Sequence, residues 1–182
     1  MDDKTIYNYA KQFYLAMDSL RDSDVFKNDD VFRWYPRGCC GNIAELLAKY
    51  LLSKGIETVY VWGKDKTEQS HAWLVIKDEH VQETKKQEFY TTNNVMSEIL
   101  ILPDNNRIND KLAIREAIYT EADVQNDLIV DIGGTWLSGI PVYVGYKNKF
   151  YEKFSFETAH SFKELAENRL FQIYQAVLEN MQ

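Results

Sequence analysis

The sequence predicts one α+β domain, in which a central cysteine-bearing helix packs on an antiparallel β-sheet together with N- and C-terminal helices. Three observations predict this class. Apolar residues recur at three- and four-residue intervals near both ends of the chain. A third apolar run of helical spacing begins at the only two cysteines, Cys39 and Cys40. Short apolar or alternating runs, which are typical of strands, follow that run.

The three predicted helices differ in how much of their surface is apolar. Residues 3–20 carry a single apolar face, which is typical of a helix that covers a core. Residues 40–54 carry a broader apolar stripe, so this helix is expected to be central and largely buried. Gly55 is suited to end it in the left-handed conformation. The third helix is predicted over 161–181, with one apolar face.

Strands are predicted where apolar residues alternate or run together over a few positions. They are expected over 58–62, 71–76, 98–102, 128–132, 141–146 and 150–156. Alternation along the second strand places His71, Trp73 and Val75 on one face. The remaining segments are expected to be a polar loop at 21–30, an extended aromatic stretch that ends at a proline at 31–36, and a short helix at 111–119.

Composition excludes several classes of function. The chain has 182 residues, 45% of them hydrophobic, a net charge of −7 and no basic stripe, so a nucleic-acid partner is not expected. No apolar run approaches the ~18 residues of a membrane span, and the N-terminus lacks the apolar stretch of a secretory signal. Two adjacent cysteines are poorly placed to bridge one another and do not match zinc-ligand spacing, so we expect reduced thiols, a cytoplasmic location and no metal or other cofactor.

Residues suited to thiol chemistry occur in three of the predicted elements. Cys40 opens the central helix, where free N–H groups and the helix dipole favour a thiolate. His71 begins a strand and could take and return a proton, and Asp131 lies in an apolar strand and could orient the imidazole. Asp123 and Asp127 lie nearby in the sequence, but Asp131 alone lies inside the apolar strand.

Three motifs in this order resemble the transglutaminase-like branch of the papain-like cysteine enzymes: Gly38-x-Cys40-x-x-x-Ala44, His71-Ala72-Trp73 and Val130-Asp131-Ile132. The resemblance implies that Cys40 is the nucleophile, His71 the general base and acid, and Asp131 the orienting carboxylate. It also implies that the helix of Cys40 is central and that His71 and Asp131 lie on an antiparallel sheet. Trp34, shortly before the cysteine, is then the candidate for an oxyanion-stabilising side chain, through its indole N–H.

The sequence departs from the family pattern after Asp131, where Ile132-Gly133-Gly134 stands in place of the frequent Pro and Thr. The long interval between His71 and Asp131 predicts an insertion at about 77–127 within a single domain of residues 1–182. Gly133 and Gly134 are expected to form a turn, with close approach of a substrate backbone as the alternative. A weaker similarity to arylamine N-acetyltransferases lies at 37–40 and 130–133, although this chain is short for their additional domains.

These observations together predict a thiol-dependent hydrolase or acyltransferase that acts on an amide or peptide-type bond of a peptide or protein through an acyl-enzyme. The alternative is a peptide- or protein-binding module that keeps the fold without turnover, and a third possibility is an acyltransferase that uses an acyl-thioester donor. Cys39 is expected to be a buried neighbour of the nucleophile, and His80 and His160 are expected on the surface. The sequence leaves the substrate, the choice between water and an amine as acceptor, and the oligomeric state open.

Overall fold

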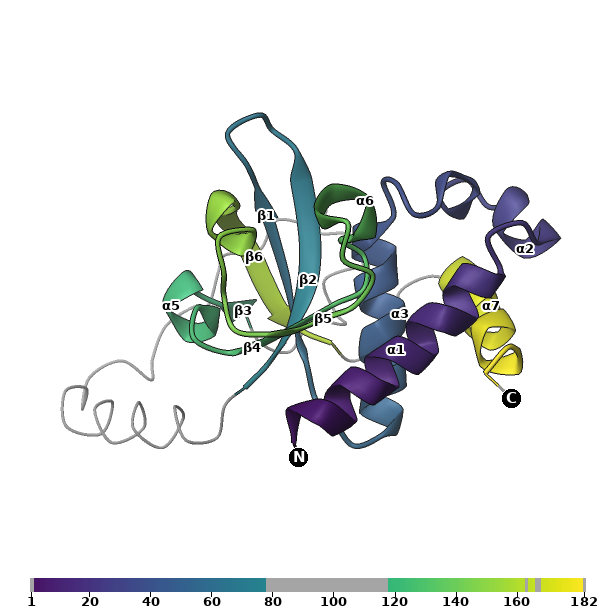
Figure 1. The fold of residues 1–182 in the computed structure, drawn as a ribbon, viewed down its shortest axis with the longest axis horizontal. Helices are drawn as coiled ribbons and strands as arrows, with labels where there is room; N and C mark the ends of the chain where they lie inside the picture. Colours follow the sequence, from purple (N-terminus) through teal and green to yellow (C-terminus); the bar gives the residue numbers. More distant parts are fainter. Residues whose placement is uncertain (1, 78–117, 163, 166–167, 182) are drawn as a thin grey trace, which may run out of the picture.

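The computed structural model describes residues 2–77, 118–162, 164–165 and 168–181, which form an antiparallel sheet with helices packed against it (Figure 1). The predicted α+β class is therefore confirmed. Within the described residues, the sheet has six strands in the order β3-β6-β1-β2-β4-β5. Their bounds are β1 Val59–Lys64, β2 Ser70–Ile76, β3 Ile118–Tyr119, β4 Leu128–Asp131, β5 Tyr143–Gly145 and β6 Ser155–Ser161.

Three longer helices pack together beside the sheet (Figure 1). They are α1 Asp3–Ser19, α3 Cys40–Ser53 and α7 Asn168–Glu179. The side chain of Asp2 accepts the N–H of Thr5 and caps the start of α1. Gly55 follows α3 with φ +75°, as the sequence predicts for a left-handed helix end. The shorter helical turns are α2 Asp24–Lys27, α5 Glu121–Val124, α6 Thr135–Ser138, and the 3₁₀ turns η1 Phe32–Trp34 and η3 Tyr151–Lys153.

The sheet separates two hydrophobic cores. On the side that we call the helical face, the sheet residues Leu74 and Val130 pack with side chains of α1, α3 and α7. On the opposite side, which we call the aromatic face, Trp73 packs with Tyr151 and Phe154 and with aliphatic residues of β1, β2 and β4. The alternation predicted for β2 is thus confirmed, because consecutive residues of that strand belong to different cores.

The candidate catalytic residues lie where β2 and β4 stop pairing. The ladder between these strands joins residues 74–76 of β2 with residues 128–130 of β4. His71 lies three residues before the paired part of β2, and Asp131 is the last residue of β4, followed by a bend at 132–133. An ideal Cβ built on Gly133 would lie 3.1 Å from the Cα of Cys40. The first residue of α3 therefore lies beside this bend.

The aromatic segment at 31–36 is not extended, contrary to the sequence-based expectation. Residues Phe32–Trp34 form the turn η1, because the buried carboxylate of Asp29 accepts the N–H groups of Val31 and Phe32, each at 2.8 Å. Arg169 at the start of α7 donates to the same carboxylate at 2.8 and 2.9 Å. The expectation of a loop over 21–30 also omits one helical turn, α2, which Ser23 caps.

The strand predicted over 150–156 is wrong in its first half. Residues Tyr151–Lys153 form the turn η3, and the strand β6 runs from Ser155 to Ser161. Tyr151 and Phe154 lie three residues apart, and both enter the aromatic-face core, which a strand would not allow. As a consequence the last helix begins at Asn168 rather than at 161.

His160 is also placed differently from the expectation. It lies in β6, is only 8% exposed and packs on the ring of Tyr60 at 4.7 Å between centroids, so it is not a surface residue. The predictions for His80 and for a strand at 98–102 lie outside the described residues, as does most of the helix predicted over 111–119. Of that predicted helix, residues 118 and 119 form the strand β3.

Candidate active site

The candidate nucleophile is at the first position of α3. Cys40 is partly exposed, whereas its neighbour Cys39 is 1% exposed and belongs to the core of the helical face. Burial, together with the nearby Cys40, raises the pKa of Cys39 to about 12, so Cys39 stays a neutral thiol at ordinary pH. The expectation that Cys39 is a buried neighbour is confirmed, and Cys40 is the thiol of this pair that solvent can reach.

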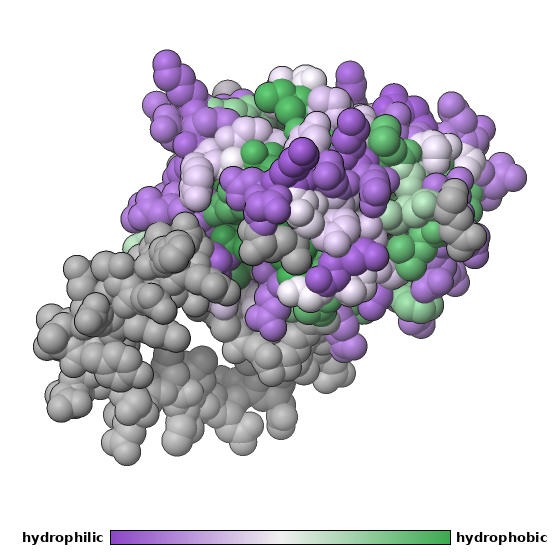
Figure 2. Space-filling model, turned by 60° about the horizontal axis from the view of Figure 1, so that its bottom comes forward, coloured by the Kyte–Doolittle hydropathy of each residue, from purple (hydrophilic) through white to green (hydrophobic). Residues whose placement is uncertain are grey.

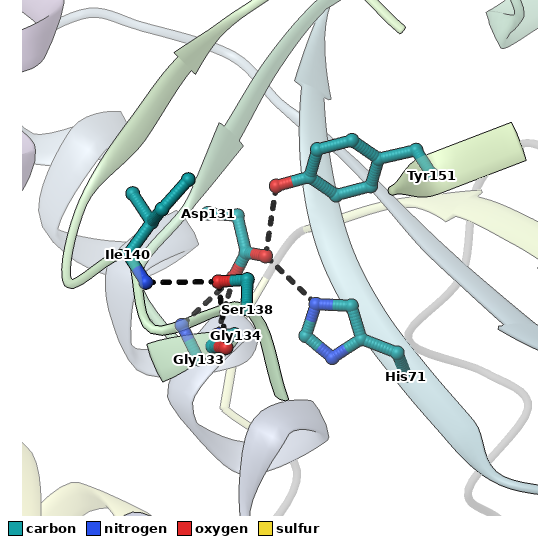
Figure 3. A network of polar contacts seen from close by, with 7 residues as sticks. All are labelled: His71, Asp131, Gly133, Gly134, Ser138, Ile140 and Tyr151. Carbon is teal, nitrogen blue, oxygen red and sulfur yellow. Dashed lines mark hydrogen bonds and ion pairs between the residues drawn. The ribbon is translucent and has the colours of Figure 1, made fainter. Parts of the chain in front are cut away.

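His71 and Asp131 form the polar pair that the sequence predicts. Nε2 of His71 lies 2.7 Å from Oδ2 of Asp131, and the two residues are 0% and 4% exposed (Figure 3). Sixty positions separate them in the sequence, and the ladder between β2 and β4 brings their strands side by side. Because a carboxylate only accepts hydrogen bonds, this contact places a proton on Nε2 and turns Nδ1 away from Asp131.

Asp131 accepts hydrogen bonds from several donors. Its Oδ1 receives the backbone N–H groups of Gly133 at 2.8 Å and Gly134 at 3.1 Å. Its Oδ2 receives the hydroxyl of Tyr151 at 3.0 Å in addition to the imidazole of His71. A buried carboxylate is costly without such partners, so these four donors allow it to stay charged beside the imidazole. The sequence analysis did not identify Tyr151 as a site residue, because it predicted a strand over residues 150–156.

The two glycines after Asp131 allow three elements to meet. A Cβ at position 134 would lie 2.7 Å from Oδ2 of Asp131 and 3.4 Å from Nε2 of His71, and a Cβ at position 133 would touch the backbone of Cys40. The bend that the sequence predicts here is present. It is also a close approach of the protein's own site residues, and the approach of a substrate backbone stays a prediction.

The groups around His71 favour the positively charged form of its imidazole. Burial lowers its pKa, but the charge and hydrogen bond of Asp131, followed by the nearby Cys40, outweigh burial and raise the pKa to about 9. Nδ1 is buried and has no hydrogen-bond partner among the described residues. Since Nε2 is taken by Asp131, Nδ1 is the ring nitrogen left for the Cys40 sulfur.

Aromatic rings enclose this imidazole on the side away from α3. Its ring centroid lies 5.8 Å from those of both Trp73 and Phe150, 5.5 Å from that of Phe154 and 6.5 Å from that of Tyr151. Trp73 is 7% exposed, so in this structure it is mainly a wall of the imidazole pocket. Rings of this size leave the imidazole few alternative positions, which keeps it aligned with Asp131.

The other residues considered from the sequence lie apart from this pair. Trp34 is 65% exposed on η1 and lies against the guanidinium of Arg33, 5.6 Å from ring centroid to Cζ, so its oxyanion role stays a prediction. Asp127 is buried and pairs with Lys77 at 2.9 Å. Asp123 closes a capping box with Thr120 at the start of α5. Asp131 is the carboxylate of these three that meets His71.

A small cavity lies on the aromatic face behind the site. It has a volume of about 20 Å³ and is lined by residues that include Trp73, Ile129, Tyr151 and Phe154. This is about the room that one water molecule needs. The cavity therefore does not accommodate a substrate, and it adjoins the rings that hold His71 rather than the thiol of Cys40.

The surface adds little that points to a ligand. Hydrophilic and hydrophobic residues are interspersed on the face drawn in Figure 2, and scattered exposed apolar side chains are ordinary. Among the described residues, no group of three or more His, Cys, Asp or Glu side chains is arranged to hold a metal ion. Within the same residues, every helix is too short or too polar to cross a membrane.

Comparison of the chain with protein-family models, with curated proteins and with solved structures found no match.

Proposed function

We propose that this protein is a thiol-dependent hydrolase or acyltransferase, with Cys40 as nucleophile, His71 as general base and acid, and Asp131 as the carboxylate that orients the imidazole. We further propose that its fold belongs to the transglutaminase-like branch of the papain-like enzymes, on the three motifs that carry that resemblance. The substrate would be an amide of a peptide or protein. The cytoplasm is the expected compartment, because its reducing conditions keep both thiols free.

The observation that carries this proposal is the hydrogen bond of 2.7 Å between His71 and Asp131, formed beside a partly exposed cysteine at a helix start. Two features of these groups support the proposal. Asp131 fixes the Nε2–H tautomer, and the raised pKa of His71, about 9, favours an imidazolium next to the sulfur. The N–H groups in the first turn of α3 have no carbonyl partner within the helix, so they favour negative charge on sulfur and on the tetrahedral intermediate.

The proposed reaction has two stages. The Cys40 thiolate adds to the substrate carbonyl carbon, the C–N bond breaks, and Nδ1–H of His71 gives its proton to the leaving amine. An acyl-enzyme joined through the sulfur remains. Water, or a second amine, then attacks this thioester while Nδ1 takes up its proton, and the C–S bond breaks to restore the thiolate and imidazolium. No step needs an oxidant or a further cofactor.

The rate of alkylation of Cys40 by iodoacetamide, followed by intact mass at pH 6, tests the activation of the thiol. An ordinary thiol of pKa about 8.5 is less than about 1% ionised at this pH. We expect wild-type protein to be alkylated at least about tenfold faster than the His71→Ala variant, because the imidazolium stabilises the thiolate. The Cys39→Ala variant is the matched control and should keep the wild-type rate.

Equal rates for wild type and His71→Ala would contradict the proposal. A second measurement tests whether Cys40 attacks a substrate-like carbonyl. The protein is offered a peptide that carries an electrophilic carbonyl in place of the scissile amide. Stoichiometric labelling of Cys40, lost in Cys40→Ala, is the result expected for an enzyme.

A binding module without turnover is the second candidate, and the complete burial of His71 is the observation that favours it. A general acid must reach the leaving group, and the imidazole of His71 has no exposed surface. A fast alkylation rate together with no labelling by the electrophilic peptide would favour this candidate. Formation of an acyl-enzyme with a small acyl-thioester instead would favour the acyltransferase of the arylamine type.

A further inference from the structure

Tyr151 takes part in the polar network of the site. Its hydroxyl donates to Oδ2 of Asp131 at 3.0 Å, and this is the same oxygen that receives Nε2–H of His71 at 2.7 Å (Figure 3). The two donors come from different elements, η3 and β2, and meet at one atom. The hydroxyl of Tyr151 and the imidazole of His71 therefore donate to the same oxygen, and each weakens the interaction of the other with its negative charge.

The surroundings of Tyr151 keep its hydroxyl protonated, so that it can donate to Asp131. Tyr151 is 2% exposed, and its ring packs against Trp73 and Phe150 with centroids 5.4 and 4.9 Å away. Burial, and then the charge of Asp131, raises its pKa, so the hydroxyl keeps its proton. The carbonyl of Asn148 accepts the N–H of Tyr151 at 2.9 Å, which anchors the turn η3.

The remaining partners of Asp131 do not constrain this oxygen in the same way. Gly133 and Gly134 donate to Oδ1, and they lie only two and three residues after Asp131 in the chain. They hold the carboxylate at one end only. The position of Oδ2 is thus set by two side chains, the imidazole that it must orient and the hydroxyl of Tyr151.

We propose that Tyr151 is a positioning residue of this site, whose hydroxyl fixes Oδ2 of Asp131 opposite His71 and, by sharing that oxygen, limits the negative charge that the imidazole meets. The hydrogen-bonded chain Tyr151–Asp131–His71 would then run from the aromatic face to the thiol of Cys40. Its consequence for the reactivity of Cys40 rests on the proposed function, whereas its consequence for the titration of His71 does not.

The direction of the expected effect follows from the groups that face the imidazole. Asp131 on β4 and Cys40 on α3 favour its charged form, and the hydroxyl of Tyr151 on η3 draws charge away from Asp131. Tyr143 on β5 packs against the ring of Tyr151 at 5.2 Å, and its own hydroxyl donates to the carbonyl of Tyr146. Removing the Tyr151 hydroxyl leaves more charge on Asp131, so the pKa of His71 should rise.

The test is a titration of the His71 ring nitrogens by ¹⁵N NMR in wild type, Tyr151→Phe and Tyr143→Phe, with His71→Gln to assign the signals. In Tyr151→Phe we expect the pKa of His71 to rise by about 0.5 unit or more. In Tyr143→Phe, which removes a neighbouring hydroxyl that donates to the carbonyl of Tyr146 instead of to Asp131, the pKa should stay at the wild-type value. A pKa that is unchanged or lowered in Tyr151→Phe would overturn the proposal.

A second variant keeps the test decisive if Tyr151→Phe does not fold. Site-specific replacement of Tyr151 by 3-fluorotyrosine keeps the shape of the ring and makes the hydroxyl a stronger donor, so the pKa of His71 should fall. No fall would overturn the proposal. Because both titrations need no substrate, a protein that fails the alkylation and labelling tests can still confirm the role of Tyr151, and the two failures are distinguishable.

Discussion

The two faces of the sheet contribute to the candidate site in different ways. The helical face is built from long elements, α1, α3 and α7, whose aliphatic and aromatic side chains form one core, and it supplies the thiol at a helix start. The aromatic face combines aliphatic residues of the strands with rings from β2 and from the turn η3, and it holds His71, Asp131 and Tyr151. Long periodic helices thus place the thiol of Cys40, and tight packing of rings places the pair of His71 and Asp131.

This difference predicts that Phe→Ala substitutions in the two cores, although similar in their cost to stability, have different effects on the alkylation rate of Cys40. Phe13 on α1 is 0% exposed and stacks on Tyr50, and Phe154 is 3% exposed and packs 5.5 Å from the ring of His71. Each Phe→Ala change should lower the free energy of unfolding by about 3–5 kcal/mol. Only Phe154→Ala should also slow alkylation of Cys40 at a pH and temperature where both variants are folded, because it frees the imidazole to move.

Urea unfolding of both variants, with alkylation rates measured well below each midpoint, checks this prediction. Equal alkylation rates in Phe13→Ala and Phe154→Ala would show that the aromatic packing does not position His71.

The pH dependence of stability tests the contribution of His71 on the aromatic face. The pKa of His71 is raised to about 9 by Asp131 and Cys40 against burial, compared with about 6.5 in an unfolded chain. A raised pKa means that the folded state binds the proton more tightly, so this contribution is fully present below pH 6.5 and is lost as the pH rises to 9. The free energy of unfolding should therefore fall over this window, by about 3 kcal/mol at most.

Denaturant unfolding at several pH values between 6 and 9 measures this loss, and the His71→Gln variant should show a much flatter profile. The buried thiol of Cys39, with its pKa raised to about 12, also begins to lower stability at about pH 8.5, where an unfolded thiol ionises, so the difference between wild type and His71→Gln isolates the imidazole. A wild-type profile as flat as that of His71→Gln would mean that the imidazole gains no charge from its partners.

The contrast between the faces also explains what sequence reasoning could recover. On the helical face, periodicity predicted α1 and α3 within about one residue at each end, and Gly55 marked the end of α3. Cys40, His71 and Asp131 could be proposed because three short motifs, each in one predicted element, follow one another in order. Local pattern was enough in these cases, since one long element or one strand face determines the position.

On the aromatic face the same reasoning failed for physical reasons. A run such as Phe150–Phe156 has the composition of a strand, and only the side-chain cap of Asn148 on the N–H of Phe150 and the core contacts of Tyr151 reveal a turn. His160 looked exposed because its neighbours in the sequence are polar, but β6 pairs with both β1 and β3 and is covered. Long-range pairing of this kind leaves no signature in a short window.

The glycines after Asp131 give the finest test of the comparison, since they lie where the two faces meet. In Gly134→Ala the new Cβ would lie 2.7 Å from Oδ2 of Asp131, so the carboxylate must move away from His71. We expect a loss of about 1–3 kcal/mol in stability and a clear fall in the alkylation rate of Cys40.

Gly55→Ala is the matched control, because its φ of +75° is strained for alanine but its Cβ would meet nothing within 4 Å. That variant should lose about 1 kcal/mol and keep the wild-type alkylation rate. If both variants lost only stability, the bend after Asp131 would be a structural turn, and the approach of Gly134 to the His71–Asp131 pair would have no consequence for the thiol.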